Sequence, residues 1–197
     1  MTKHRLELFS DGVFAIVLTL LVLDLHVPAA HGLAGLWQTV PALLVHAATF
    51  LTVGAFWHMH HGALARVTEV TSRTLLLNLV ALFWITLLPF GARNAAGRPL
   101  DPLGASLIAA SCGFYFVSIL IMRLSAHSTI DDNPQMRTWK RGRLILGSAI
   151  SMANIVCAAL AWVSPWFGYA SALATVALVL LLRSPPEAEQ AFERQTT

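Results

Sequence analysis

Polar side chains interrupt a long apolar stretch near the start of the chain. The stretch reads "RLELFSDGVFAIVLTLLVLDL" over residues 5–25, with Ser10 and Asp11 in its first turns and Thr19 among leucines and isoleucines. A carboxylate can hold a cation, and a threonine hydroxyl offers oxygen lone pairs to one. A helix that only anchored a protein in a bilayer would avoid both groups, because each is costly there unless it has a partner.

Histidines end the second apolar stretch. They lie in "AFWHMHHGAL", where His58 and His61 are three residues apart and therefore share one face of a helix. That spacing suits two ligands of a transition metal. Asp11 is the only acid expected nearby, and the apolar stretches offer no further acid or histidine at a comparable depth, because His46 lies several turns away. A transition-metal cation transporter that uses His58 and His61 with Asp11 is therefore the alternative hypothesis.

The elements that carry these residues are predicted to be transmembrane helices. Of the 197 residues, 56% are hydrophobic and 12% are charged, whereas a soluble domain has about 25% charged residues. A helix needs about 20 apolar residues to span a bilayer. Six stretches qualify: residues 6–26, 36–58, 74–91, 103–122, 143–163 and 166–182. We expect an all-α integral membrane protein, with residues 1–184 forming one six-helix unit and residues 185–197 a disordered tail.

The basic residues predict the orientation of these helices. With the N-terminus inside, only Arg93 and Arg98 of the 13 lysines and arginines fall in outer segments. Because lysine and arginine accumulate on the cytoplasmic side, both termini are expected to be cytoplasmic. The net charge of +3 then reflects this bias, and no nucleic-acid partner is expected. The predicted location is the plasma membrane, with the lipid bilayer as a partner.

The first apolar stretch forms a narrow stripe when it is drawn as a helix. At about 100° per residue, one face collects the following residues: Phe9, Gly12, Ile16, Thr19, Leu20 and Leu23. Asp11 falls on the far side, toward the rest of the protein, and Asp24 lies near the outer end. Apolar residues at helical spacing usually form ordinary helix–helix contacts, so packing and a functional surface are both open interpretations of the stripe.

Asp11 is expected to have polar neighbours at its depth in the membrane. The second helix returns to the inner side with His60 and His61, and the third begins there with Asn78. Buried polar groups need partners. The sequence predicts a structural cluster that joins the first three helices, formed by Arg5, Ser10, Asp11, His60 or His61, and Asn78. Proton sensing and direct ion binding are alternative roles for the same cluster.

Three motifs resemble the transmembrane protein 175 family. The first helix carries the signature Arg-x-x-x-Phe-Ser-Asp as Arg5, Phe9, Ser10 and Asp11. The second ends with "FW..HH", and the third contains "NL......LPF", which begins at Asn78. The resemblance covers about the N-terminal half, whereas the last three helices match only in number and hydrophobicity. Its animal member is the endolysosomal potassium channel, and its bacterial members carry a single six-helix repeat.

The resemblance implies a homotetrameric, potassium-permeable cation channel whose pore is lined by the first helix. It implies a constriction at Ile16, further pore positions at Leu20 and Leu23, and a potassium preference linked to Thr19. One helix cannot enclose a pore, so symmetry-related copies must surround an axis. Apolar rings can then gate by dewetting, and Asp24 could concentrate cations at the mouth.

An enzyme is not expected. The sequence contains neither the HExxH motif of metalloproteases nor the GxSxG motif of serine hydrolases. The histidine-rich segment has no acid at the position that a metal-activated water requires. We therefore predict no catalytic residues, no cofactor and no bound metal.

Overall fold

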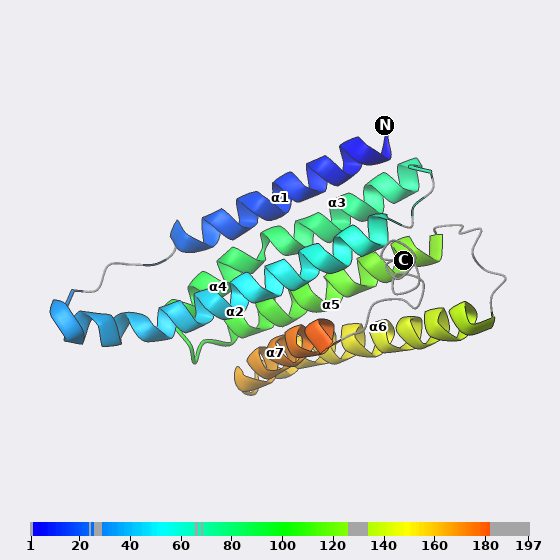
Figure 1. Cartoon of the computed structure of the whole chain (residues 1–197). Helices are drawn as coiled ribbons and strands as arrows, with labels where there is room; N and C mark the ends of the chain where they lie inside the picture. The colour runs from blue at the N-terminus through cyan, green and yellow to red at the C-terminus, as the bar shows by residue number, and fades with distance from the viewer. Residues whose placement is uncertain are drawn as a thin grey trace, which may run out of the picture.

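The structure, a computed structural model, describes residues 2–23, 25, 29–65, 67, 69–125 and 134–181, and only the backbone of 134–140. All regular structure in these residues is helical, and Figure 1 shows the helices running roughly along one common direction. Their bounds are α1 Lys3–Leu23, α2 Gly32–Leu64, α3 Ser72–Thr86, α4 Leu88–Gly97, α5 Pro102–Ser125, α6 Pro134–Leu160 and α7 Trp166–Leu181. The predicted all-α class is confirmed. The predicted tail and Asp24 lie outside the described residues.

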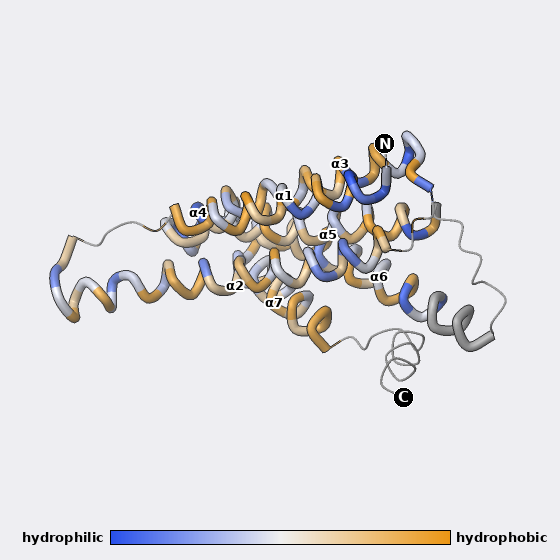
Figure 2. The backbone as a smooth tube through the Cα atoms, turned by 45° about the horizontal axis from the view of Figure 1, so that its top comes forward, coloured by the Kyte–Doolittle hydropathy of each residue, from blue (hydrophilic) through white to orange (hydrophobic). Residues whose placement is uncertain are grey.

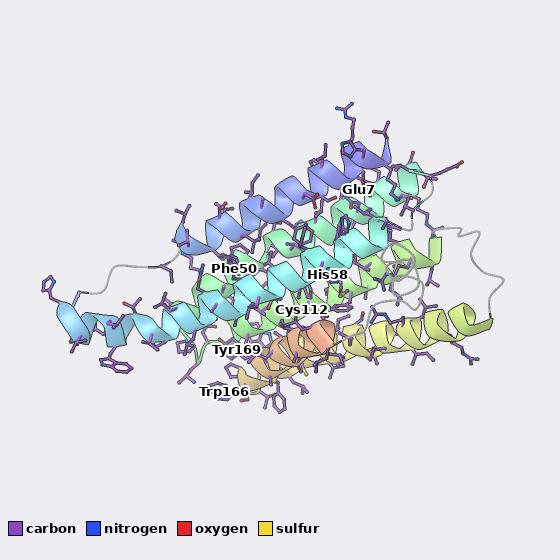
Figure 3. All side chains as sticks on the ribbon, in the orientation of Figure 1. Glu7, Phe50, His58, Cys112, Trp166 and Tyr169 are labelled. Carbon is purple, nitrogen blue, oxygen red and sulfur yellow. The ribbon has the colours of Figure 1, made fainter. Side chains whose placement is uncertain are left out.

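The helices have the length and composition of membrane spans. Five apolar segments are long enough to cross a bilayer: Lys3–Leu23, Gly32–Leu64, Ser72–Gly97, Pro102–Leu124 and Arg141–Leu160. Apolar residues dominate most of their length (Figure 2). The sixth, α7, has 16 residues, about 24 Å, which is less than the hydrocarbon thickness of about 30 Å. Glu7 lies near the start of α1, at the other end of the bundle from Trp166 and Tyr169 (Figure 3).

The third predicted span is divided into α3 and α4 at Leu87. The Leu87 backbone is still in the right-handed helical region, at φ −84° and ψ −16°. Pro89 follows in the first turn of α4. Proline has no N–H to donate, and its ring displaces the carbonyl four residues earlier, so the helix is interrupted just before it. The "LPF" motif therefore marks a break within one span.

The second helix is longer than the sequence analysis predicted. It has 33 residues, about 50 Å, and its N-terminal part extends past the other helices (Figure 1). Pro41 lies in the N-terminal half of α2, and Leu36 and Trp37 in the same half are exposed. The C-terminal half of α2 contains most of its buried residues, so this half forms most of the contacts with the bundle.

The centre of the bundle is α5, which packs against α2, α3, α4, α6 and α7. Small residues permit the close approach. A Cβ atom added to Gly168 of α7 would lie 2.5 Å from the carbonyl oxygen of Ala105 in α5. A polar bond also joins the last two helices, since Asn154 Nδ2 donates to Thr175 Oγ1 at 2.7 Å. These contacts attach α6 and α7 to the half of the chain that carries the predicted site.

We expect the substitution Gly168→Ala to destabilise the protein by about 1–2 kcal/mol, because the new methyl group meets backbone atoms of α5 that cannot rotate away. Thermal unfolding of the purified protein in detergent measures this loss. Gly54→Ala in α2 is the control, because a Cβ atom there has no neighbour within 4 Å. The control should be neutral or slightly stabilising. An equal melting temperature for both variants would contradict the close packing of α5 and α7.

Candidate functional site

The first helix has one face inside the bundle and one face outside it. Its buried residues are Leu6, Ser10, Phe14, Val17 and Leu21. They recur every three to four positions, so they form a single face, which packs against α2, α3 and α4. The residues of the opposite face are exposed.

The stripe predicted from the sequence lies on this outer face. Ile16 is 59% exposed, Leu20 45% and Leu23 74%. Phe9, Gly12 and Thr19 are also exposed. Removing apolar surface from water is favourable by about 25 cal/mol per Å². We therefore expect lipid or another chain to cover these side chains. The geometry fits either lipid or symmetry-related copies, and the pore roles of these residues stay predictions.

Thr19 donates the only hydrogen of its hydroxyl back to its own helix. The acceptor is the Ile16 carbonyl oxygen, at 2.8 Å. A hydroxyl group has one hydrogen and two lone pairs. Because the hydrogen is already used, Thr19 presents only acceptor capacity to its surroundings. That is the property needed to coordinate a cation.

A buried hydrogen-bonded cluster lies behind the stripe. Asn78 of α3 is fully buried at 0% exposure. Its Oδ1 lies 3.2 Å from the Ser10 hydroxyl of α1 and 2.8 Å from His60 Nε2 of α2. The Ser10 hydroxyl also lies 2.9 Å from the Leu6 carbonyl oxygen. The structure thus brings together three of the residues predicted for the cluster, one from each of the first three helices.

Tyr115 of α5 extends this cluster and was not predicted. Its hydroxyl donates to the Phe56 carbonyl oxygen at 2.8 Å and lies 3.4 Å from His60 Nδ1. The ring of Phe14 packs edge-on against His60, with centroids 5.3 Å apart. The one sequence signal was a tyrosine in the middle of an apolar span, which usually has a hydrogen-bond partner when buried.

The hydrogens of the cluster are constrained by this arrangement. The contact with Asn78 Oδ1 requires a hydrogen on His60 Nε2. A neutral imidazole with its hydrogen on Nε2 has a lone pair on Nδ1. That lone pair can share the Tyr115 hydroxyl hydrogen with the Phe56 carbonyl oxygen. The neutral Nε2–H tautomer of His60 therefore satisfies both contacts.

The remaining residues predicted for the cluster lie outside these hydrogen bonds. Asp11 is half-buried and accepts a hydrogen bond from Trp57 Nε1 at 2.8 Å. His61 is exposed, and its ring centroid lies 6.4 Å from that of Trp57. Arg5 is exposed on α1. Trp57 is part of the "FW..HH" motif, but nothing in that motif indicates that its indole pairs with the acid. Asp11 therefore attaches α1 to α2 at a second point.

The alternative metal site receives no geometric support. His58 and His61 are both exposed on α2, and the Asp11 carboxylate is held by Trp57. The described part of the chain contains no group of three or more histidine, cysteine or acidic side chains that could hold a metal ion. Both free cysteines, Cys112 and Cys157, lie within apolar helices.

These features define a multi-pass α-helical membrane protein whose first helix is tied to the bundle by buried polar contacts. Comparison with known proteins then gives its family. Residues 5–89 match the family model described as endosomal/lysosomal potassium channel TMEM175. The chain is 35% identical over 134 residues to a protein of Chryseobacterium sp. (strain P1-3) named as a potassium channel. That match covers 66% of this chain and 70% of the relative. The chain belongs to the TMEM175 family, a family of channels and not of enzymes.

Two further comparisons define the extent of the likeness. The human endosomal/lysosomal proton channel TMEM175 is 31% identical over 179 residues, which cover 81% of this chain and 35% of the human protein. The chain thus spans about a third of that relative. The crystal structure of a lysosomal potassium-selective channel TMEM175 homolog from Chamaesiphon minutus has a TM-score of 0.64 at 24% identity. It covers 91% of this chain and 96% of the solved one, so the fold is shared.

Proposed function

We propose that the chain is the subunit of a homotetrameric, potassium-permeable cation channel of the plasma membrane, with both termini cytoplasmic. The observation that carries the proposal is the uncovered stripe on α1 in a member of a channel family. Relatives named as potassium channels support potassium as the permeating ion. The bias of lysine and arginine toward one side supports the orientation.

The stripe can form a gate when four copies surround an axis. Rings of Ile16, Leu20 and Leu23 would face one another across the pore. A narrow apolar passage excludes water, and a cation cannot cross it without losing its hydration shell. The channel is therefore closed where these rings are close and conducts when they separate or become wet. Asp24 near the outer end would raise the local cation concentration.

Thr19 supplies the polar step within this apolar passage. Its hydroxyl points only lone pairs outward, because its hydrogen is held by the Ile16 carbonyl. A ring of four such oxygens would partly replace the water around a passing cation. A strongly hydrated small cation gains less from this than a larger one, which favours potassium over sodium.

The buried cluster holds the pore helix from behind. Ser10 reaches Asn78 on α3, and Asp11 reaches Trp57 on α2, so two polar contacts fix the rotation of α1 about its axis. Rotation by a single residue step, about 100°, would turn the stripe out of the pore. The structural role of the cluster is thus to keep Ile16, Thr19 and Leu20 directed at the axis.

The test is potassium and sodium flux into liposomes that contain the purified protein. Wild type should pass potassium faster than sodium, and Thr19→Val should reduce the preference about fivefold, equivalent to about 1 kcal/mol. Thr86→Val is the matched control, because Thr86 is an exposed helical threonine with the same bond to the carbonyl three residues back. The absence of flux in wild type would contradict the proposed channel function. An equal effect of both substitutions would show that Thr19 does not line the pore.

A further inference from the structure

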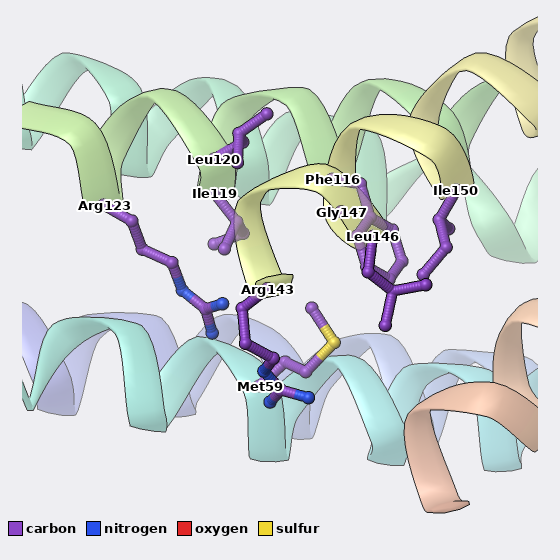
Figure 4. Close-up of a pocket in the computed structure, with 9 residues that line it drawn as sticks. All are labelled: Met59, Phe116, Ile119, Leu120, Arg123, Arg143, Leu146, Gly147 and Ile150. Carbon is purple, nitrogen blue, oxygen red and sulfur yellow. The ribbon is translucent and has the colours of Figure 1, made fainter. Parts of the chain in front are cut away.

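A cleft at one end of the bundle carries two arginines that the channel proposal leaves without a role. It lies where α2, α5 and α6 meet (Figure 4). Its lining residues are Met59, Phe116, Ile119, Leu120, Arg123, Arg143, Leu146, Gly147 and Ile150. Arg123 is in the last turn of α5, and Arg143 lies close to the start of the apolar part of α6. Both arginines therefore lie near the level where the hydrocarbon region ends.

The cleft has an apolar floor and a charged rim. Met59, Phe116, Ile119 and Ile150 are buried, whereas the two arginines are half-buried. Figure 4 shows both arginine side chains extending from their helices toward α2. They also have interactions within the chain. A guanidinium carries five N–H donors in a planar group. Two like charges at one cleft favour an anion that accepts hydrogen bonds from both.

The size of the cleft limits what the anion can be. The cleft is small and partly open to the surface, with a cavity volume of about 30 Å³. A whole soluble metabolite would not fit inside. A ligand that keeps most of its bulk outside the cleft, beside α5 and α6, fits better. A phospholipid does so, because its phosphate can meet the arginines while an acyl chain covers Leu120, Leu146 and the floor.

We propose that Arg123 and Arg143 form a binding site for the phosphate of an anionic phospholipid in the leaflet at this end of the bundle. Basic pockets between transmembrane helices are suited to such head groups. The arginine pair binds the phosphate oxygens through charge-assisted N–H donors, and the apolar floor binds the first part of an acyl chain. The proposal requires only that the chain lies in a bilayer, so it does not depend on the channel function.

The test is native mass spectrometry of the full-length protein in detergent with added phosphatidylglycerol or phosphatidylcholine. We expect one phosphatidylglycerol per chain, held at least about tenfold more tightly than phosphatidylcholine. Arg123→Gln and Arg143→Gln should each weaken it about tenfold, the loss expected for a charge-assisted contact. Arg141→Gln is the matched control, because Arg141 is exposed on the same helix and does not line the cleft. Equal binding of the two lipids, or an equal effect of Arg141→Gln and Arg143→Gln, would overturn the site.

Two further measurements show whether the shape of the cleft matters for lipid binding and whether the ligand is a lipid or free phosphate. Gly147→Leu narrows the cleft without changing a charge, since a Cβ atom at Gly147 meets only Leu120 Cδ1, at 3.7 Å. Gly147→Leu should weaken the binding of phosphatidylglycerol, whereas Gly142→Leu should not, because a Cβ atom at Gly142 has no neighbour within 4 Å. If an arginine variant no longer elutes as folded protein in size-exclusion chromatography, the two glycine variants decide the test. Inorganic phosphate that displaces the lipid at equal concentration would show a free-phosphate site and overturn the lipid assignment.

Discussion

Replacing Ile16 by asparagine should raise potassium flux into liposomes about tenfold, equivalent to about 1.4 kcal/mol removed from the barrier. The reason is the proposed gate. Four isoleucine side chains around an axis exclude water from the narrowest part of the pore, and four amides would let water and a hydrated cation in. The side chain is 59% exposed on α1, so the change should leave the fold of the subunit intact.

The control for this result is Val22→Asn. Val22 is 52% exposed on the same helix, but it lies about 120° away from Ile16 and outside the stripe. An asparagine there meets lipid or a neighbouring helix, so flux should stay at the wild-type level. Equal gains for the two variants would mean that a polar group anywhere on α1 makes the membrane leak. No gain from Ile16→Asn would remove Ile16 from the constriction.

The sequence predicted the parts of the fold that depend on apolar length and helical period. Hydrophobic runs located the helices, and the three-to-four-residue spacing on α1 placed Ile16 and Leu20 on the face opposite Asp11. The same rules could not place the ends of α2, because a helix can continue beyond the hydrocarbon region without changing its composition. They also did not predict the interruption at Leu87, since a proline near the end of a span is compatible with a kinked or a divided helix.

The partners of the polar residues were harder to predict than their depth. Ser10, Asn78 and the pair His60 and His61 share a level along the helices, so depth alone predicted that Ser10 and Asn78 lie near one of the two histidines. Depth does not give rotation, however, and rotation decides whether Asp11 meets His61 or Trp57. Tyr115 entered the cluster from α5, which no motif linked to the first three helices. The exposure of the stripe likewise does not distinguish a lipid-facing surface from a pore-lining surface, because both kinds of surface are exposed in a single subunit.

Loss of the Asn78 amide should be the most destabilising change in the cluster. We expect Asn78→Leu to lower the free energy of unfolding by about 2–3 kcal/mol, because it leaves the buried His60 Nε2 without its partner while the size of the side chain hardly changes. Thermal unfolding in detergent measures the loss. Asn94→Leu is the matched control, since Asn94 is only half-buried and its Oδ1 has no hydrogen-bond partner. The control should be neutral or stabilising, because it removes a buried acceptor atom that has no partner.

The double variant Asn78→Leu with His60→Leu separates a lost hydrogen bond from lost packing. Removing both polar partners eliminates the unsatisfied group, so the pair should cost less than the sum of the single changes. Strict additivity would mean that Asn78 and His60 act independently, despite the 2.8 Å between Oδ1 and Nε2. The pore proposal predicts a second consequence. A variant that keeps its fold but frees α1 to rotate should lose the flux gain of Ile16→Asn, because residue 16 no longer faces the axis.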